Sequence, residues 1–249
     1  MDKPKIIVIS LIKNEDLYIK QVLNNVTDFA DEIMVLDNMS TDNTYDIVEG
    51  MAKDNDKIKL QKIQSFKQSG AFTRPYFTTN TWFLSVDGDE LYDKTGLQRM
   101  RAEILDGKFE DRWAISGYFL NCIEVDFDKN MAKGYMSPPS RPCIRLYNLK
   151  ALRKWAQRKH RFHGGKPIFN KGYSLKSRYS MHKHLSWDES YLRFIHLCFI
   201  KRSSTDDSIC RVNPTEIKLG RKVNSKYKKE IYKVGDIVDI DIKGFHEQV

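Results

Sequence analysis

The sequence has no long apolar run and only four cysteines, and these two scarcities exclude several classes of protein. No stretch reaches the roughly 18 to 20 apolar residues of a membrane-spanning helix, and the first residues lack the basic and apolar regions of a signal peptide. No Cys-x-x-Cys pair is present, so we expect reduced, packed thiols and no zinc site. The sequence therefore predicts a cytoplasmic protein without a transmembrane segment.

Carboxylates are scarce in the second half of the chain. Residues 1–140 hold 17 Lys and Arg against 23 Asp and Glu, whereas residues 141–233 hold 24 against 6. A basic region beside a more acidic one suggests a polyanionic partner, either nucleic acid or an anionic lipid or glycan. The lysine-rich segment 221–229 is a solvated stretch that could contact phosphates. Aromatic residues interleave with the bases between 155 and 187, which suits a nucleic-acid groove and a protein core equally.

The first third of the chain alternates between strand and helix patterns. Residues 5–12 form an apolar run rich in β-branched side chains, which is typical of an interior parallel strand. From Leu17 the apolar residues recur at helical spacing, and Asn14 is placed to cap that helix. The same patterns predict a strand over 32–37, a helix over 45–51 and a strand over 57–63. This order predicts an α/β fold with a mostly parallel sheet flanked by helices.

A second apolar run, residues 82–86, ends abruptly in carboxylates. It predicts a buried strand that delivers Asp87, Asp89 and Glu90 to the edge where open α/β sheets bind ligands. Two carboxylates separated by Gly88 offer a divalent cation such as Mg²⁺ or Mn²⁺ part of an oxygen shell. The remaining coordination positions stay open for substrate phosphates. Taken alone, the same residues are also compatible with a plain acidic turn after a strand.

Four segments in order make the chain resemble a family 2 glycosyltransferase with the GT-A fold. They are Ser10–Glu15 after the first strand, Leu36–Thr44 after the second, Arg74, and Asp87–Glu90 as the DxD-type motif. The resemblance implies a hexosyl- or pentosyltransferase that uses a nucleotide-sugar donor, a UDP-sugar being expected. It also implies a GT-A-like sheet, to which the charge distribution adds a basic carboxyl-terminal extension.

The resemblance assigns roles to individual residues. Asp37 is expected to accept a hydrogen bond from the nucleotide base, and Arg74 to contact the nucleotide end of the donor. Asp89 is expected to hold the Mn²⁺ or Mg²⁺ that bridges the diphosphate, with Asp87 nearer the ribose and sugar. The donor-binding set implied by the resemblance is Ser10, Leu11, Asn14, Glu15, Asp37, Asn38, Arg74, Asp87 and Gly88.

The later motifs match the family less closely. Residues 141–147 resemble the Arg-Leu-Tyr strand of a subgroup that includes lipopolysaccharide core transferases, but the subgroup's following His-Glu pair is replaced by His160-Arg-Phe-His163. His184 fits a His-x-Ser segment that opens a helix, and we expect it to complete the metal shell with Asp87 and Asp89. An inverting enzyme needs a base near the acceptor hydroxyl. The candidates lie together at Glu124, Asp126 and Asp128, of which Asp126 is our choice and Glu124 the second.

These observations predict one catalytic domain over residues 1–200 and a basic region over 201–249 packed on it. Within the domain, residues 1–95 bind the nucleotide sugar and 96–200 face the acceptor. Three hypotheses stay open. The first is a glycosyltransferase acting on hydroxymethylated or already glucosylated DNA, in the host cytoplasm if the protein is viral. The second is a transferase of surface polysaccharide or lipopolysaccharide assembly, with a peripheral membrane location. The third is a non-catalytic protein on the same scaffold.

Overall fold

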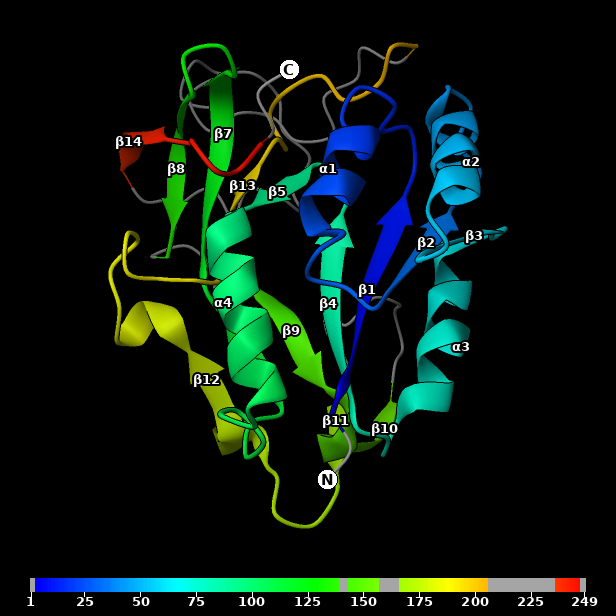
Figure 1. Ribbon diagram of the computed structural model, residues 1–249, viewed down its shortest axis with the longest axis vertical. Helices are drawn as coiled ribbons and strands as arrows, with labels where there is room; N and C mark the ends of the chain where they lie inside the picture. Colours follow the sequence, from blue (N-terminus) through cyan, green and yellow to red (C-terminus); the bar gives the residue numbers. More distant parts are fainter. Residues whose placement is uncertain (1–2, 139–142, 157–165, 206–235, 247–249) are drawn as a thin grey trace.

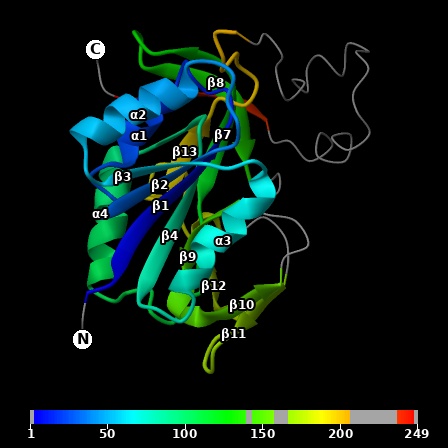
Figure 2. The same ribbon diagram turned by 90° about the vertical axis from the view of Figure 1, so that its right-hand side faces the viewer.

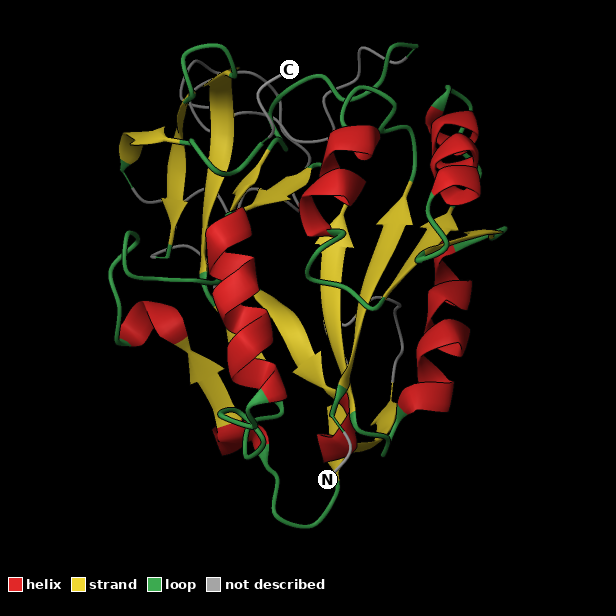
Figure 3. Ribbon diagram, viewed as in Figure 1, coloured by secondary structure: helices red, strands yellow, loops and turns green. Residues whose placement is uncertain are grey.

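The computed structural model describes residues 3–138, 143–156, 166–205 and 236–246. Its largest sheet has the strand order β12-β6-β9-β4-β1-β2-β3. The bounds of these strands are Arg178–Ser180, Ala114–Ser116, Ile144–Asn148, Thr81–Asp87, Lys5–Ile12, Glu32–Asp37 and Ile58–Lys62. Strands β4, β1, β2 and β3 run parallel, and β9 is antiparallel to both β4 and β6. The expected α/β fold with a mostly parallel sheet is confirmed, and Figure 3 shows helices on both sides of it.

A second sheet stands beside the first and was not foreseen from the sequence. Its strands follow the order β14-β8-β7-β13-β5, with bounds Ile237–Asp241, Met131–Ser137, Tyr118–Asp126, Arg193–His196 and Glu90–Tyr92. A two-stranded hairpin completes the strands, formed by β10 (Leu152–Ala156) and β11 (Lys166–Phe169). Short strands such as β5 and β13 leave too few residues for an alternating pattern to be read with certainty from the sequence.

The helices divide between the two faces of the large sheet. Helices α1 (Ile19–Val26), α2 (Thr44–Asp54) and α4 (Lys94–Leu105) cover one face, and α3 (Ser69–Thr73) covers the other together with the β10–β11 hairpin (Figures 1 and 2). Strand β1 serves both cores, because its residues alternate in direction. Ile6 and Val8 belong to the hydrophobic core on the face covered by α1, whereas Ile7 and Ile9 belong to a separate core on the opposite face. No helix in the described ranges is both long and apolar enough to cross a bilayer.

The helix after β1 begins later than the capping pattern predicts. Its first residue is Ile19 and its N-cap is Tyr18, so the expected cap at Asn14 is wrong. Asn14 instead adopts a φ of 55°, in the left-handed region that asparagine tolerates better than most residues. Its side-chain oxygen accepts a hydrogen bond from Thr41 N at 2.9 Å. The residue therefore ties the loop after β1 to the loop after β2.

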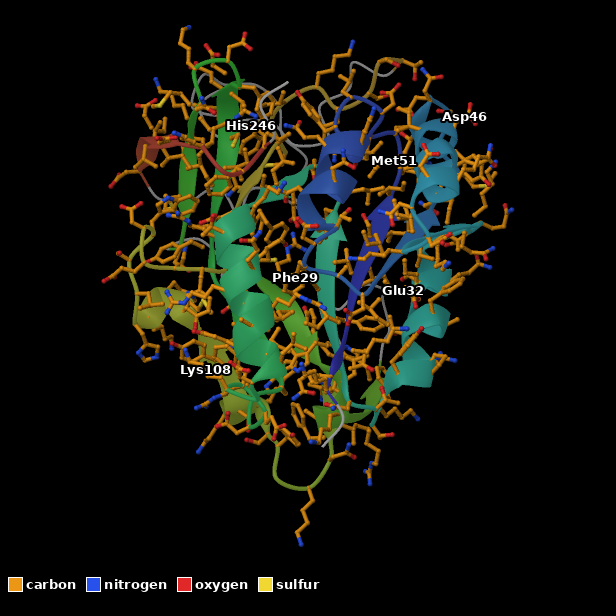
Figure 4. The ribbon with its side chains drawn as sticks, in the orientation of Figure 1. Phe29, Glu32, Asp46, Met51, Lys108 and His246 are labelled. Carbon is orange, nitrogen blue, oxygen red and sulfur yellow. The ribbon has the colours of Figure 1, made fainter. Side chains whose placement is uncertain are left out.

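The carboxyl-terminal segment returns to the body of the protein. Strand β14 pairs antiparallel with β8, from Ile237 opposite Tyr135 to Asp241 opposite Met131. Just beyond it, His246 lies beside the β7–β8 hairpin (Figure 4). Its ring packs edge-on against Phe127, and its Nε2 lies 2.9 Å from Asn130 Oδ1. Residues 236–246 thus extend the second sheet.

Gly117 lies where two strands approach too closely for a side chain. A Cβ atom at this position would lie 1.6 Å from the backbone oxygen of Leu192. We therefore expect Gly117→Ala to lower the free energy of unfolding by about 1 to 3 kcal/mol, because the backbone must shift to accommodate the methyl group. Urea denaturation measures this. Gly50→Ala is the matched control, since Gly50 is in a helix with nothing within 4 Å of an added Cβ. Equal stability of the two variants would contradict the packing argument.

Candidate functional site

The site forms where the strand order of the large sheet reverses. After β1 the chain adds β2 and β3 on one side, and β4 then pairs with β1 on the other. Such a switch point is where open α/β sheets bind ligands, outside the carboxyl ends of the strands. Register places Asp87 of β4 opposite Leu11 of β1, and Asp37 of β2 opposite Ile12. The upper ends of β1 and β4 in Figure 1 mark this edge.

The second sheet brings a histidine to the same edge. After Asp87 the chain turns through Gly88 and Asp89 into β5, whose Glu90 pairs with His196 of β13. Asp87, Asp89 and His196 each offer a ligand atom, and these atoms lie within 4.8 Å of one another. Two carboxylates and an imidazole form a donor set that a divalent cation can use. Among the described residues, this is the group that fits a metal ion.

Asp89 is buried at the centre of this arrangement. Only 2% of the residue is exposed, and its Oδ2 lies 2.9 Å from Arg202 Nη1 and 3.4 Å from His196 Nε2. Burial alone would raise the pKa of Asp89, but the neighbouring His196 and Arg202 charges lower it to about 2. Burial likewise opposes the charge on His196, while Cys198 and Asp89 raise its pKa to about 10. The carboxylate and the imidazolium therefore stabilise each other's charged forms.

Asn121 fixes the orientation of the histidine ring. His196 Nδ1 lies 3.1 Å from Asn121 Oδ1, which has only lone pairs to offer, so Nδ1 carries a proton and donates. The other ring nitrogen, Nε2, then faces Asp89. Cys198 Sγ donates to the same amide oxygen at 3.3 Å. Asn121 thus holds the ring of His196, a candidate ligand, in the way that hydrogen-bonding partners hold ligating histidines in metal sites.

Arg145, on β9, contacts two of the acidic residues and holds them in place. Its guanidinium bonds to Glu90, which is fully buried, and to Asp87 Oδ2 at 3.2 Å. Burial raises the pKa of Glu90 and the Arg145 charge lowers it in part, which leaves it at about 7. Glu90 also accepts hydrogen bonds from Tyr92 Oη at 3.1 Å and from Asp87 N at 3.2 Å. Glu90 therefore positions the turn, whereas Asp87 and Asp89 line the site.

Glu15 explains why residue 88 is glycine. A Cβ atom at position 88 would lie 2.7 Å from Glu15 Cγ, so the two segments touch only because Gly88 has no side chain. Glu15 is 6% exposed, and its Oε1 accepts a hydrogen bond from Arg202 Nη1 at 2.9 Å. Burial and the charge of Asp89 raise the pKa of Glu15 to about 9. Within the described part of the chain, its Oε2 is buried without a hydrogen-bond partner.

The other residues expected near the donor lie partly here. Ser10 and Asp37 are fully buried at the ends of β1 and β2, and the Asp37 carboxylate accepts hydrogen bonds from the backbone and hydroxyl of Ser40. Asn38 follows directly, and its backbone N–H donates a hydrogen bond to Ile12 O at 2.9 Å. Together with Leu11, Asn14 and Glu15, these residues form the ends of β1 and β2 and the loops that follow them.

Arg74 and His184 contact residues other than the acidic group of the site. Arg74 lines a separate cavity of about 120 Å³ on α3, together with Lys67 and Trp155. His184 is exposed, and its ring stacks on Tyr179 with centroids 5.5 Å apart. It does not belong to the group of ligand atoms around Asp87, where His196 stands instead. The segment after it, residues 185–192, forms turns where the motif predicts a helix.

The two candidate bases lie on β7, at the end that leads into the β7–β8 turn. Asp126 accepts from Lys129 Nζ at 2.8 Å across this turn, and Glu124 is exposed on the same strand. Neither belongs to the group of ligand atoms formed by Asp87, Asp89 and His196. The sequence motif at His160–His163, the lysine-rich segment 221–229 and Cys210 lie outside the described residues.

Three residues at the site were missed in the sequence, Asn121, His196 and Arg202, and Arg145 was recognised only as part of the Arg-Leu-Tyr strand, without a role. One signal was available for His196, because it ends a short apolar strand in the same way as Asp87 does. No comparable signal marks Asn121, whose role depends on pairing between β7 and β13.

Comparison with known proteins gives a consistent result. Residues 7–115 match the model for glycosyl transferase family 2. A glycosyltransferase of Rickettsia felis is 30% identical over 146 residues, which cover 59% of this chain and 48% of the relative. Glycosyltransferase SunS of Bacillus subtilis is 36% identical over 96 residues, or 37% of this chain and 22% of SunS. The chain spans about half the length of the Rickettsia relatives it matches.

Two solved structures resemble part of this chain, with low TM-scores and low sequence identity. A mannosyltransferase from Pyrobaculum calidifontis, in complex with GDP-Man and Mn²⁺, has a TM-score of 0.37 and 19% identity, covering 50% of this chain and 37% of its own. Glucosyl-3-phosphoglycerate synthase from Mycobacterium tuberculosis has a TM-score of 0.35 and 17% identity, with 47% and 44% covered.

Proposed function

Because residues 7–115 carry the pattern of the glycosyl transferase family 2, we propose that this chain transfers a sugar from a nucleotide-sugar donor with the help of a divalent cation. The observation that carries the proposal is the group formed by Asp87, Asp89 and His196 at the switch point of the sheet. This group is built from buried or half-buried residues at the place where the family pattern puts its DxD motif.

Asp87, Asp89 and the neutral form of His196 would hold the cation, so binding would release the proton that Nε2 carries in the imidazolium. When bound, the cation neutralises negative charge that develops on the departing nucleoside diphosphate. An imidazole in the donor set favours Mn²⁺ over Mg²⁺, which strongly prefers oxygen ligands and keeps several waters. The residues of the chain supply the rest: Arg145 and Glu90 hold the turn that carries both aspartates, and Asn121 holds the imidazole.

The nucleotide would lie over the loops after β1 and β2. Ser10, Leu11, Asn14, Glu15, Asp37 and Asn38 are the residues we propose around it, with a UDP-sugar as the donor. Asp37 accepts two hydrogen bonds from Ser40 and has about four acceptor positions, but it is fully buried, so a base would bond to it once Ser40 gives way. We retain Asp126 as the proposed base, with Glu124 second, and Arg74 as a proposed contact to the nucleotide end.

Removing the side chain that orients His196 tests the cation site directly. We expect Asn121→Ala to weaken Mn²⁺ binding by about ten- to a hundredfold, because outer-shell partners of ligating histidines have effects of this size. Calorimetric titration of the free protein measures it. Asn170→Ala is the control, since the amide nitrogen of Asn170 also donates a hydrogen bond, to Lys150 O at 2.7 Å. An unchanged Mn²⁺ affinity in Asn121→Ala would remove His196 from the site.

For the acceptor we propose a polyanion, with hydroxymethylated or already glucosylated DNA as the first choice. The support is the charge difference between residues 1–140 and 141–233. The described cations Arg153, Lys154 and Lys166 lie on β10 and β11, at the end of the molecule opposite the upper ends of β1 and β4 (Figure 1). An acceptor that contacts both ends must be extended, as DNA is.

The acceptor is tested by transfer of label from radiolabelled UDP-sugars with Mn²⁺. Unmodified DNA, hydroxymethylated DNA, glucosylated DNA and a lipid extract are offered side by side. We expect the label on one of the modified DNAs. Label found only in the lipid extract would replace DNA by a lipid-linked or surface-glycan acceptor.

A further inference from the structure

A short segment crosses the top of the site after β13. We call residues Lys201–Thr205 the strap. Three of its residues bind to the loops after β1 and β2. Arg202 O accepts from Leu17 N at 3.2 Å, Ser203 Oγ donates to Asp42 Oδ2 at 2.5 Å, and Ser204 N donates to Asp16 Oδ1 at 2.7 Å. The strap is therefore attached through the backbone of Arg202 and through the two serines that follow it.

The side chain of Arg202 points from the strap into the acidic residues. Its Nη1 lies 2.9 Å from Glu15 Oε1 and 2.9 Å from Asp89 Oδ2, and the side chain is 17% exposed. One guanidinium nitrogen thus joins a carboxylate from the loop after β1 to a carboxylate from the turn after β4. The bond to Asp89 joins two charged groups, and such hydrogen bonds are among the strongest that side chains make.

The position of Arg202 conflicts with a bound cation. Asp89 belongs to the group of Asp87, Asp89 and His196, and the Asp89 oxygen that Arg202 contacts is also the one nearest to His196. A divalent cation held by Asp89 would stand close to the guanidinium, and like charges a few ångströms apart in a partly buried site repel each other. The two positive groups therefore compete for one carboxylate.

We infer that Arg202 is a resident counter-ion of Asp89, that a divalent cation displaces it, and that the strap loosens when the cation binds. This inference rests on the proposed cation site, and it adds to that site a change in the strap when the cation binds. With Asp89 taken by the cation, Arg202 loses its contact with Asp89. The strap then keeps the contact of Arg202 with Glu15 and the backbone and hydroxyl contacts of residues 202–204.

The affinity for Mn²⁺ in the absence of nucleotide tests this inference. We expect Arg202→Gln to bind Mn²⁺ about tenfold more tightly than the wild type, since it removes a charge-assisted hydrogen bond that the cation must break. Arg99→Gln is the matched control, because Arg99 also pairs with a glutamate but lies on α4. It is expected to leave the affinity unchanged. Asp89→Asn serves as the variant in which Mn²⁺ binding is lost.

The outcomes separate the inference from the proposed function. Equal Mn²⁺ affinities of wild type and Arg202→Gln, with binding lost in Asp89→Asn, would overturn the inference and leave the cation site standing. If neither the wild type nor Arg202→Gln binds Mn²⁺, both the cation site and the inference are overturned.

Hydrogen exchange of the wild-type protein gives a second test that needs no variant at position 202. The backbone amide of Leu17 donates a hydrogen bond to the strap, and the backbone amide of Ser204 donates one from the strap. We expect both amides to exchange faster when Mn²⁺ is added to the wild type, and to show no change in Asp89→Asn. Slower exchange with Mn²⁺, or no change in the wild type at saturating Mn²⁺, would show that the strap does not open.

Discussion

Asp89→Asn is expected to lower the rate of sugar transfer by about a hundredfold or more, since a metal ion at a phosphoryl group contributes several kcal/mol to catalysis. The change removes a carboxylate oxygen but keeps the shape of the side chain. Transfer of label at saturating donor, with Mn²⁺ present, measures it. Asp111→Asn is the control, because Asp111 is an exposed acid that pairs with Arg112. It should leave the rate unchanged.

The stability of Asp89→Asn must be measured together with its activity. The sequence suggests a solvated metal ligand whose loss leaves the fold intact, but Asp89 is buried and paired with both His196 and Arg202. Its loss leaves two cations without this partner, so some destabilisation is expected. Assays therefore belong well below the melting temperature, with circular dichroism as a check. Full transfer by folded Asp89→Asn would remove Asp89 from the proposed mechanism.

Arg145→Met should be the most destabilising of the variants considered. Arg145 is 4% exposed, and its guanidinium neutralises Glu90, which is fully buried. Breaking a buried ion pair by removing one partner costs about 3 to 5 kcal/mol, because the other charge stays buried. For a chain of this size that corresponds to a fall of roughly 10 °C in melting temperature. Differential scanning calorimetry measures the shift.

A double variant shows whether the ion pair is the cause. In Arg145→Met with Glu90→Gln, no fully buried charge is left alone, since the other partner of Arg145, Asp87, has a side chain that is 17% exposed. The amide oxygen introduced at position 90 can still accept the hydrogen bond that Tyr92 Oη gives to Glu90. We expect this double variant to recover more than half of the lost stability. Lys108→Met is the comparison for an exposed pair, with Glu103, and should cost at most about 1 kcal/mol. A double variant no more stable than Arg145→Met would point to lost packing of the arginine instead.

The sequence predicts the first half of the fold well because its signals are local. Strand β1 has the bounds that the apolar run gives, and β2, β3 and β4 lie where the patterns place them. Strands β1, β2 and β4 are buried along most of their length, and β1 and β2 are each followed by a helix, so hydrophobic periodicity and turn residues decide the structure. The metal motif is predictable for the same reason, since Asp87 and Asp89 end one strand.

The remainder of the site depends on contacts between distant segments. His196 reaches Asp89 only because β13 pairs with β5, and Arg145 reaches Glu90 because β9 runs antiparallel to β4. His184 has the residue type and spacing of a family motif, but the fold places it against Tyr179. Glu15 illustrates the same limit: it belongs to a recognised motif, yet its contact with Gly88 follows from how two loops pack. Local patterns contain no information on such pairings.

Metal-dependent use of a nucleotide sugar is measured most directly as release of nucleotide from a panel of nucleotide sugars by the wild-type protein, without acceptor. Each donor is incubated with Mn²⁺, with Mg²⁺ and with a chelator. We expect slow hydrolysis of at least one donor with Mn²⁺, less with Mg²⁺, and none once the metal is chelated. Hydrolysis that continues unchanged in the chelator would contradict the role given to Asp87, Asp89 and His196. Failure to bind or cleave any donor would contradict the proposal of a nucleotide-sugar transferase.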